Sequence, residues 1–174
     1  EDNSEDIDLR DSITKVLQHP TVSSKSFLIT IGDRTVSGMV ARDQFVGPYQ
    51  VPVSDYSLSL SSYTSNNGEV LSIGEKPTIA LINPAASMRM ALGEALTNMS
   101  GVVIKGLNNV QVSANWMAAS GENSDDFALR SGVEALSKIA VDLKVSIPVG
   151  KDSLSMRTKW SENNSDYEVS SPLS

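Results

Sequence analysis

The stretch SMRMALGEALTNMSG (87–101) decides the fold class, because its apolar residues repeat with the period of an α-helix. The repeating positions are Met88, Ala91, Leu92, Ala95, Leu96 and Met99. A helix with this spacing presents one apolar stripe to a core. Gly101 suits the end of the helix, since glycine readily adopts the conformation found just after a helix C-terminus. We therefore predict an amphipathic helix from about residue 83 to 100 that packs against another layer.

Further helices and strands are predicted on both sides of this helix. A second long helix is indicated by Leu129, Val133, Leu136, Ala140 and Leu143, and a short one by residues 7–18, which end before His19-Pro20. A hairpin is predicted from strands 27–31 and 35–40, joined by a Gly32-Asp33 turn. Other strands are predicted at 51–60, 110–116 and 145–149, and residues 69–73 form either a strand or a helix start. The expected fold is α+β, a mixed or antiparallel sheet with helices on one face.

Composition excludes several classes of partner. The chain has 174 residues, a formal net charge of -7 and a pI near 4.6. Nucleic-acid backbones and anionic membrane surfaces need clustered Lys and Arg, so neither is expected as a partner. The chain contains no cysteine, which excludes a disulfide framework and a thiolate metal site and weakly favours a reducing compartment. We expect a cytoplasmic protein.

The polar ends of the chain suggest how it is organised. Residues 1–6 are expected to be a disordered tail, residues 7–160 one domain, and residues 161–174 a linker to a following domain. Position 1 is not Met, which either natural processing or excision from a longer polypeptide explains.

Three oxygen-bearing side chains are candidate metal ligands. Glu94 and Asn98 are four residues apart in the predicted helix, so they emerge on one face. Asp55 interrupts an apolar strand pattern. Carboxylate and amide oxygens suit Mg²⁺, which prefers hard oxygen ligands. A solvated helix edge and an ordinary strand end are the alternative interpretations, and spacing alone favours them.

Other polar segments carry weaker signals. In PVGKDSLS (148–155), a strand leads into a polar turn that could hold a phosphate, although the segment lacks the frame of a P-loop. Arg42-Asp43-Gln44 is either a functional loop or, more in line with its pattern, a salt-bridged turn. His19 is the only histidine and is better placed to cap a helix than to act in catalysis. No set of residues suffices for nucleophilic catalysis.

Four segments carry a resemblance to a known family. They are DRTVSGMVARDQFVGPYQVPVSD (33–55), GEALTNM (93–99), SANWMAASGE (113–122) and IPVGKDSLSM (147–156). In order and spacing they resemble phosphoribosylformylglycinamidine synthase of the large single-chain type, over about residues 7–160. The part resembled is the sheet-forming domain of the second synthetase half, which is like the N-terminal domain of aminoimidazole ribonucleotide synthetase.

The resemblance implies a site and a set of partners. Asp55, Glu94 and Asn98 would bind Mg²⁺ of a bound ATP or ADP, and Ser54 would lie beside the nucleotide. Lys151, Asp152 and Ser153 would lie near the same cleft. The half-site would be auxiliary, and no residue of this chain would be catalytic. The partners implied are the homologous first-half domain, whose sheet would complete a barrel with this one, a following α/β domain and a glutaminase domain.

The resemblance also implies the parent activity. The family is a ligase that uses ATP and glutamine to convert formylglycinamide ribonucleotide to formylglycinamidine ribonucleotide in purine biosynthesis. The isolated piece should be inactive. One alternative is a purely structural or dimerisation module that pairs with itself through the sheet. Another is aminoimidazole ribonucleotide or selenophosphate synthetase, whose glycine-rich metal motifs are not found here.

Overall fold

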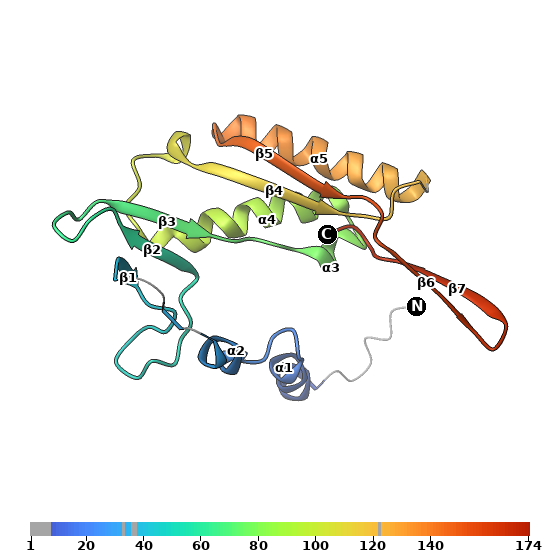
Figure 1. Cartoon of the computed structure of the whole chain (residues 1–174), viewed down its shortest axis with the longest axis horizontal. Coiled ribbons are helices and arrows are strands. Elements are labelled where there is room, and N and C mark those ends of the chain that lie inside the picture. Colours follow the sequence, from blue (N-terminus) through green and yellow to red (C-terminus); the bar gives the residue numbers. More distant parts are fainter. Residues whose placement is uncertain (1–7, 33, 36–37, 122) are drawn as a thin grey trace.

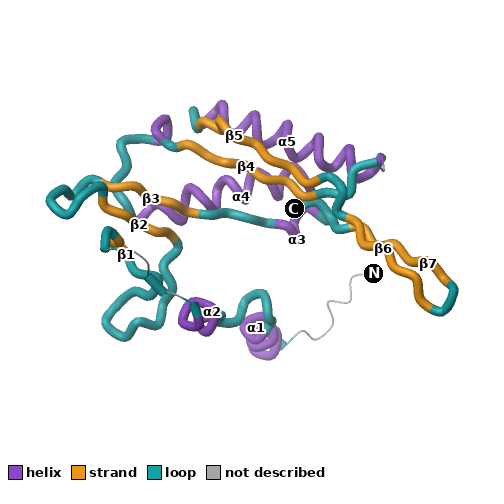
Figure 2. Tube along the Cα trace, in the orientation of Figure 1, coloured by secondary structure: helices purple, strands orange, loops and turns teal. Residues whose placement is uncertain are grey.

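The computed structural model describes residues 8–32, 34–35, 38–121 and 123–174. Its main body consists of β-strands lying along two long helices, α4 (Pro84–Asn98) and α5 (Asn123–Leu143) (Figures 1 and 2). The predicted α+β class is confirmed. Within the described residues, no helix is long and apolar enough to cross a membrane.

The two long helices pack against each other and form the core with β4 (Gln111–Met117) and β5 (Ser146–Ser153). Gly132 permits close contact, since a Cβ there would lie 2.9 Å from the Cγ of Met88. The helix predicted at 83–100 is present as α4, and its start is capped: the Asn83 side chain accepts a hydrogen bond from the Ala86 amide, and Pro84 follows the cap. The core lies between these helices and strands, and its buried residues are Ala80, Met88, Leu92, Ala114, Ala118, Leu136, Ala140, Val145 and Leu173.

A three-stranded antiparallel sheet precedes the long helices. Its order is β1 (Val40–Arg42), β2 (Tyr56–Leu60) and β3 (Gly68–Ser72). The alternation predicted for β2 is observed, with Tyr56, Leu58 and Leu60 half-buried and the serines between them exposed. The short helix α3 (Pro77–Ala80) then leads into α4, and two 3₁₀ turns, η1 (Met99–Gly101) and η2 (Leu107–Asn109), connect α4 to β4.

The predicted hairpin at 27–40 is wrong in its first strand. Residues Ser26–Ile31 form helix α2, and its Thr30 hydroxyl donates to the Ser26 carbonyl four residues back. An apolar run forms a strand only if another strand satisfies its backbone groups; here local helical bonds satisfy them instead. The predicted turn includes Asp33, and residues 36–37 belong to the predicted second strand; all three lie outside the described residues. The short helix predicted at 7–18 is confirmed as α1 (Leu9–Gln18), although none of its side chains is buried.

Two other predicted strands have different bounds in the structure. In the 51–60 segment, regular pairing begins only at Tyr56, and Val53 forms an isolated bridge with Phe45. The predicted turn after Val149 is wrong, because β5 continues to Ser153 in parallel pairing with β4. Its backbone stays extended because the β4 ladder supplies hydrogen-bond partners as far as Met117.

The C-terminal residues form a hairpin and then return to the core. Strands β6 (Arg157–Glu162) and β7 (Ser165–Ser170) pair with each other and project from the main body (Figure 1). Trp160 and Tyr167 stack on this hairpin with ring centroids 5.2 Å apart. Leu173 is buried, and Ser174 exchanges both backbone hydrogen bonds with Met117. The domain boundary predicted at residue 160 therefore falls inside β6.

Candidate functional site

The candidate site is centred on the segment that leaves β3 and crosses α4, residues 73–76. The Ser72 hydroxyl donates to the Ala95 carbonyl of α4 at 2.6 Å. Gly74 follows, and a Cβ at this position would lie 2.0 Å from the carbonyl oxygen of Ala91 and 2.6 Å from the amide of Ala95. These are backbone atoms of a helix and cannot move aside. Glycine therefore allows the segment to lie directly on the surface of α4.

Glu94 binds this segment with both carboxylate oxygens. Its Oε1 lies 2.6 Å from the Nζ of Lys76, and its Oε2 accepts a hydrogen bond from the Glu75 amide at 2.9 Å. The Lys76 ammonium and then the Glu75 amide hold the pKa of the Glu94 carboxyl below its usual value. Glu94 is therefore ionised at neutral pH and already faces one cation.

Asn98 lies one turn further along the same face of α4. Its Nδ2 donates to the Ile73 carbonyl at 2.9 Å. An amide nitrogen held in this way leaves the Oδ1 of the same side chain as the acceptor. Glu94 and Asn98 therefore both contact the 73–75 backbone, on the face that their spacing predicts.

Asp55 approaches the same segment from the sheet side. It is exposed and directly precedes Tyr56, which pairs with Ser72 at the end of β3. Asp55 therefore lies beside Ile73, whose carbonyl Asn98 binds. Glu94 and Asn98 thus hold one short segment, whereas Asp55 lines a hollow that includes Ile73 but that neither Glu94 nor Asn98 lines. Among the described residues, no group of three or more His, Cys, Asp and Glu side chains is close enough to hold a metal.

A hollow of about 390 Å³ lies over the start of β2. Ser54 and Asp55 line it together with Thr35, Arg42 and Gln44. The Ser54 amide donates to the Gln44 carbonyl, and its hydroxyl donates to the Tyr56 carbonyl at 2.7 Å. The Ser54 hydroxyl therefore fixes the turn into β2, and the hollow contains a cation, a carboxylate and amide groups.

The Arg42-Asp43-Gln44 loop is a salt-bridged turn, but the cation is Arg34 rather than Arg42. The Arg34 guanidinium donates two hydrogen bonds to the Asp43 carboxylate and lies 4.7 Å from the centroid of the Phe45 ring. The Arg34 side chain is the main reason why the pKa of Asp43 is lowered. Arg42 instead lies over the Tyr56 ring, beside the hollow.

The structure does not group Lys151, Asp152 and Ser153 as the sequence suggested. All three belong to β5, where successive side chains point to opposite faces. Lys151 donates to the Ser153 hydroxyl on one face, while Asp152 pairs in register with Trp116 on the other. None of the three lines the hollow at Asp55.

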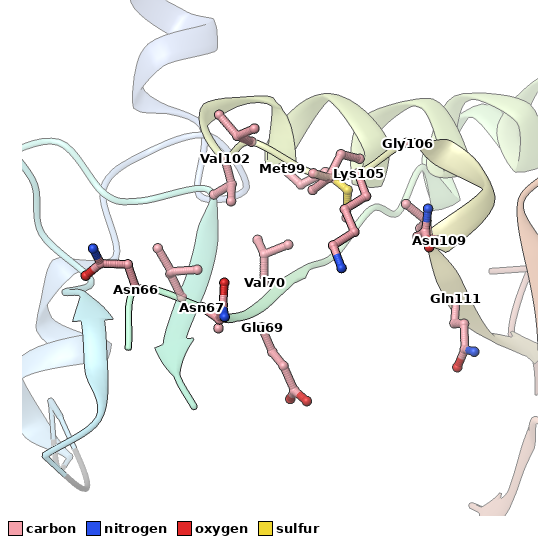
Figure 3. Close-up of a pocket in the computed structure, with 15 residues that line it drawn as sticks. Asn66, Asn67, Glu69, Val70, Met99, Val102, Lys105, Gly106, Asn109 and Gln111 are labelled. Atoms are coloured by element: carbon pink, nitrogen blue, oxygen red, sulfur yellow. The ribbon is translucent and has the colours of Figure 1, made fainter. Parts of the chain in front are cut away.

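Another hollow, larger than the one at Asp55, lies elsewhere. It measures about 850 Å³ and lies between β3 and the 102–111 segment. Figure 3 shows Lys105 extending from that segment into the space between Val70 and Asn109. None of the predicted site residues lines this groove, although Glu69 and several amide side chains do. The smaller hollow is the one that predicted residues line, namely Ser54 and Asp55.

A comparison with known protein families identifies the chain. The family model described as FGAR-AT PurM_N-like domain matches residues 24–174. The chain belongs to this family. FGAR-AT denotes the amidotransferase that acts on formylglycinamide ribonucleotide in purine biosynthesis, a multidomain, ATP-dependent enzyme. The match includes both hairpin strands β6 and β7 and the buried Leu173.

The residues present are chemically suited to Mg²⁺. The donors at Asp55, Glu94 and Asn98 are all oxygens, the ligand type that Mg²⁺ prefers. The ammonium of Lys76 lies 2.6 Å from Glu94, so the carboxylate already stabilises one positive charge. Sequence reasoning did not single out Lys76, because no local pattern links it to a glutamate in a different element.

Proposed function

We propose that this chain provides one half of a magnesium-nucleotide site in an FGAR amidotransferase. The bound nucleotide would be ATP or ADP, and its role auxiliary, supporting the fold around the synthetase centre. The parent reaction would be the ATP- and glutamine-dependent conversion of formylglycinamide ribonucleotide to formylglycinamidine ribonucleotide. The family match supports the parent enzyme, and the residues around 73–75 support the half-site.

One observation carries the half-site. Residues 73–75 are held by Glu94 and Asn98 from α4, and Ile73 lines the same hollow as Asp55, which directly precedes β2. In this proposal, oxygen ligands from a helix and from the residue that precedes a strand would converge at this segment. Ser54, which begins the same turn, would lie at the nucleotide.

Each side chain has a distinct role in this proposal. Glu94 and Asp55 would supply anionic oxygens to the metal, and Asn98 would supply its amide oxygen while its nitrogen stays on Ile73. When bound, Mg²⁺ would neutralise phosphate charge that an acidic chain of net charge -7 could not neutralise alone. Lys151, Asp152 and Ser153 do not line the hollow at Asp55. They would face the nucleotide only in a cleft that neighbouring domains complete. No residue of this chain is assigned to catalysis.

A second candidate function, a structural pairing module, rests on exposed apolar side chains. Leu71 and Ile73 of the β3 region are 67% and 74% exposed, and Met117 and Val149 are partly exposed on one side of the β4–β5 pair. Such surface favours association with another sheet. In the parent enzyme the partner would be the homologous first-half domain; the isolated chain would form a homodimer.

Ligand-dependent thermal stabilisation separates these functions. A ligand stabilises the folded state by about 2.7 kcal/mol at a concentration a hundred times its Kd. For a domain of this size we expect MgADP to raise Tm by about 5 to 10 °C. Asp55→Asn and Glu94→Gln should remove most of this rise, each judged against its own Tm without ligand.

The matched control is Asp142→Asn, which removes an exposed carboxylate from α5 and should keep the full rise. Absence of a rise in the unsubstituted chain, together with a stable dimer in analytical ultracentrifugation, would replace the half-site with the structural function. An undiminished rise in Asp55→Asn and Glu94→Gln would place the nucleotide elsewhere.

A further inference from the structure

Lys76 is held in place at both of its ends. It is the N-terminal cap residue of α3, and its carbonyl accepts a hydrogen bond from the Ser87 hydroxyl at 2.7 Å. Ser87 is itself only 3% exposed, so this anchor is buried. At the other end, the Nζ of Lys76 contacts the Oε1 of Glu94 at 2.6 Å. The backbone of Lys76 is therefore fixed by the fold, and its ammonium rests against Glu94.

The pair that Lys76 makes is also partly shielded from solvent. The side chains of Lys76 and Glu94 are 32% and 31% exposed, less than either partner in the pairs Lys15–Asp11 and Arg130–Glu134. A charge pair is worth more where solvent screens it less. The neighbouring carboxylates of Asp55 and Glu75 are exposed. Lys76 is thus the cation that neutralises Glu94 when no metal is present.

The geometry points to Lys76 as a built-in competitor for the divalent cation of the half-site: its ammonium occupies the cation position at Glu94 and must withdraw before a metal can bind there. This inference rests on the half-site proposed above and goes beyond it by assigning a residue that sets metal affinity. Two cations cannot share one carboxylate oxygen at contact distance without strong repulsion.

The side chain of Lys76 can withdraw without disturbing the fold. The anchor to Ser87 is made by the backbone carbonyl, and the Glu75 amide binds the other oxygen of Glu94. Rotation about the side-chain bonds would move the ammonium into solvent while residues 73–76 stay on α4. A long, flexible lysine stem allows this movement at low cost.

The test uses Mn²⁺ alone as the probe, because its electron paramagnetic resonance signal reports the unbound ion. Lys76→Met keeps the length of the stem and removes the charge, and it should lower the Kd for Mn²⁺ about fivefold. Lys76→Arg keeps the charge and should leave the Kd within about twofold of the unsubstituted chain. The matched control is Lys159→Met, which removes an ammonium that pairs with Glu168 at 3.0 Å on the β6–β7 hairpin. It should leave the Kd unchanged.

The Mn²⁺ titration distinguishes failure of the competitor role of Lys76 from failure of the half-site itself. If Asp55→Asn weakens Mn²⁺ binding while Lys76→Met binds as weakly as the unsubstituted chain, or more weakly, Lys76 is not a competitor and the half-site stands. If no variant shows saturable binding that depends on Asp55, both proposals fall. Circular dichroism of each variant before titration ensures that only folded protein is compared.

Discussion

Replacing Gly74 with alanine should destabilise this domain strongly, because residues 73–76 lie directly on α4. The added Cβ would lie 2.0 Å from the Ala91 carbonyl oxygen and 2.6 Å from the Ala95 amide nitrogen. Both distances are far below van der Waals contact, and both atoms belong to the helix backbone. The segment must therefore lift away from α4.

The loss of stability can be calculated from the contacts that form only when residues 72–75 lie against α4. Three hydrogen bonds tie residues 72–75 to α4: the Ser72 hydroxyl to Ala95, the Ile73 carbonyl to Asn98, and the Glu75 amide to Glu94. Each contributes about 0.5 to 1.5 kcal/mol. Loss of all three predicts a decrease of about 2 to 4 kcal/mol in the free energy of unfolding, or a Tm lower by about 5 to 15 °C.

Urea denaturation followed by circular dichroism measures this change, and the same helix provides a control. Gly93 lies within α4, and a Cβ there would meet nothing within 4 Å. Gly93→Ala should therefore stabilise the domain by about 0.5 to 1 kcal/mol, since alanine is the better helix former. If Gly74→Ala unfolds within about 0.5 kcal/mol of the unsubstituted chain, the segment does not lie on α4 as described, and the arrangement of the candidate site is wrong.

Two further predictions concern the core and the ionisation of the site. Leu92 packs between the two long helices and is only 4% exposed, so Leu92→Ala should lower the free energy of unfolding by about 2 to 5 kcal/mol in urea denaturation. The control Leu9→Ala, at a side chain that is 72% exposed, should change this free energy little. Similar losses in the two variants would contradict the assigned core. Because Lys76 lowers the folded-state pKa of Glu94, this carboxylate contributes stability that is present above its unfolded pKa, near 4.5, and is lost as pH falls through the lowered value. The Tm difference between the unsubstituted chain and Glu94→Gln should therefore shrink as the pH falls below about 4.5, and a difference that stays constant on acidification would refute the pairing.

Helix periodicity accounts for what could be predicted about the long helices. The apolar spacing from Met88 to Met99 lies within one element, so it can be interpreted without knowing what packs on the helix. The same method failed at Ser26–Ile31, where an apolar, β-branched run forms a helix. Strand formation there would require a partner strand, and local sequence does not report whether one is present.

The candidate site was only partly predictable for a related reason. The four-residue spacing of Glu94 and Asn98 predicted their common face, because that relation is local to one helix. Their partners, Glu75 and Ile73, are 19 and 25 positions away in the sequence. No sequence period links such positions, so the role of Lys76 beside Glu94 became visible only in the fold.

The order of residues along the chain was enough to predict the α+β class, the two long amphipathic helices and the oxygen-rich character of the candidate ligands. These properties depend on residue type and on spacing within single elements. The packing of separate elements is what reveals that Glu94 and Asn98 hold residues 73–75, that Lys151 and Asp152 point to opposite faces of β5, and that Lys76 neutralises Glu94. Those relations depend on which elements pack together, and packing is a property of the whole chain rather than of any one segment.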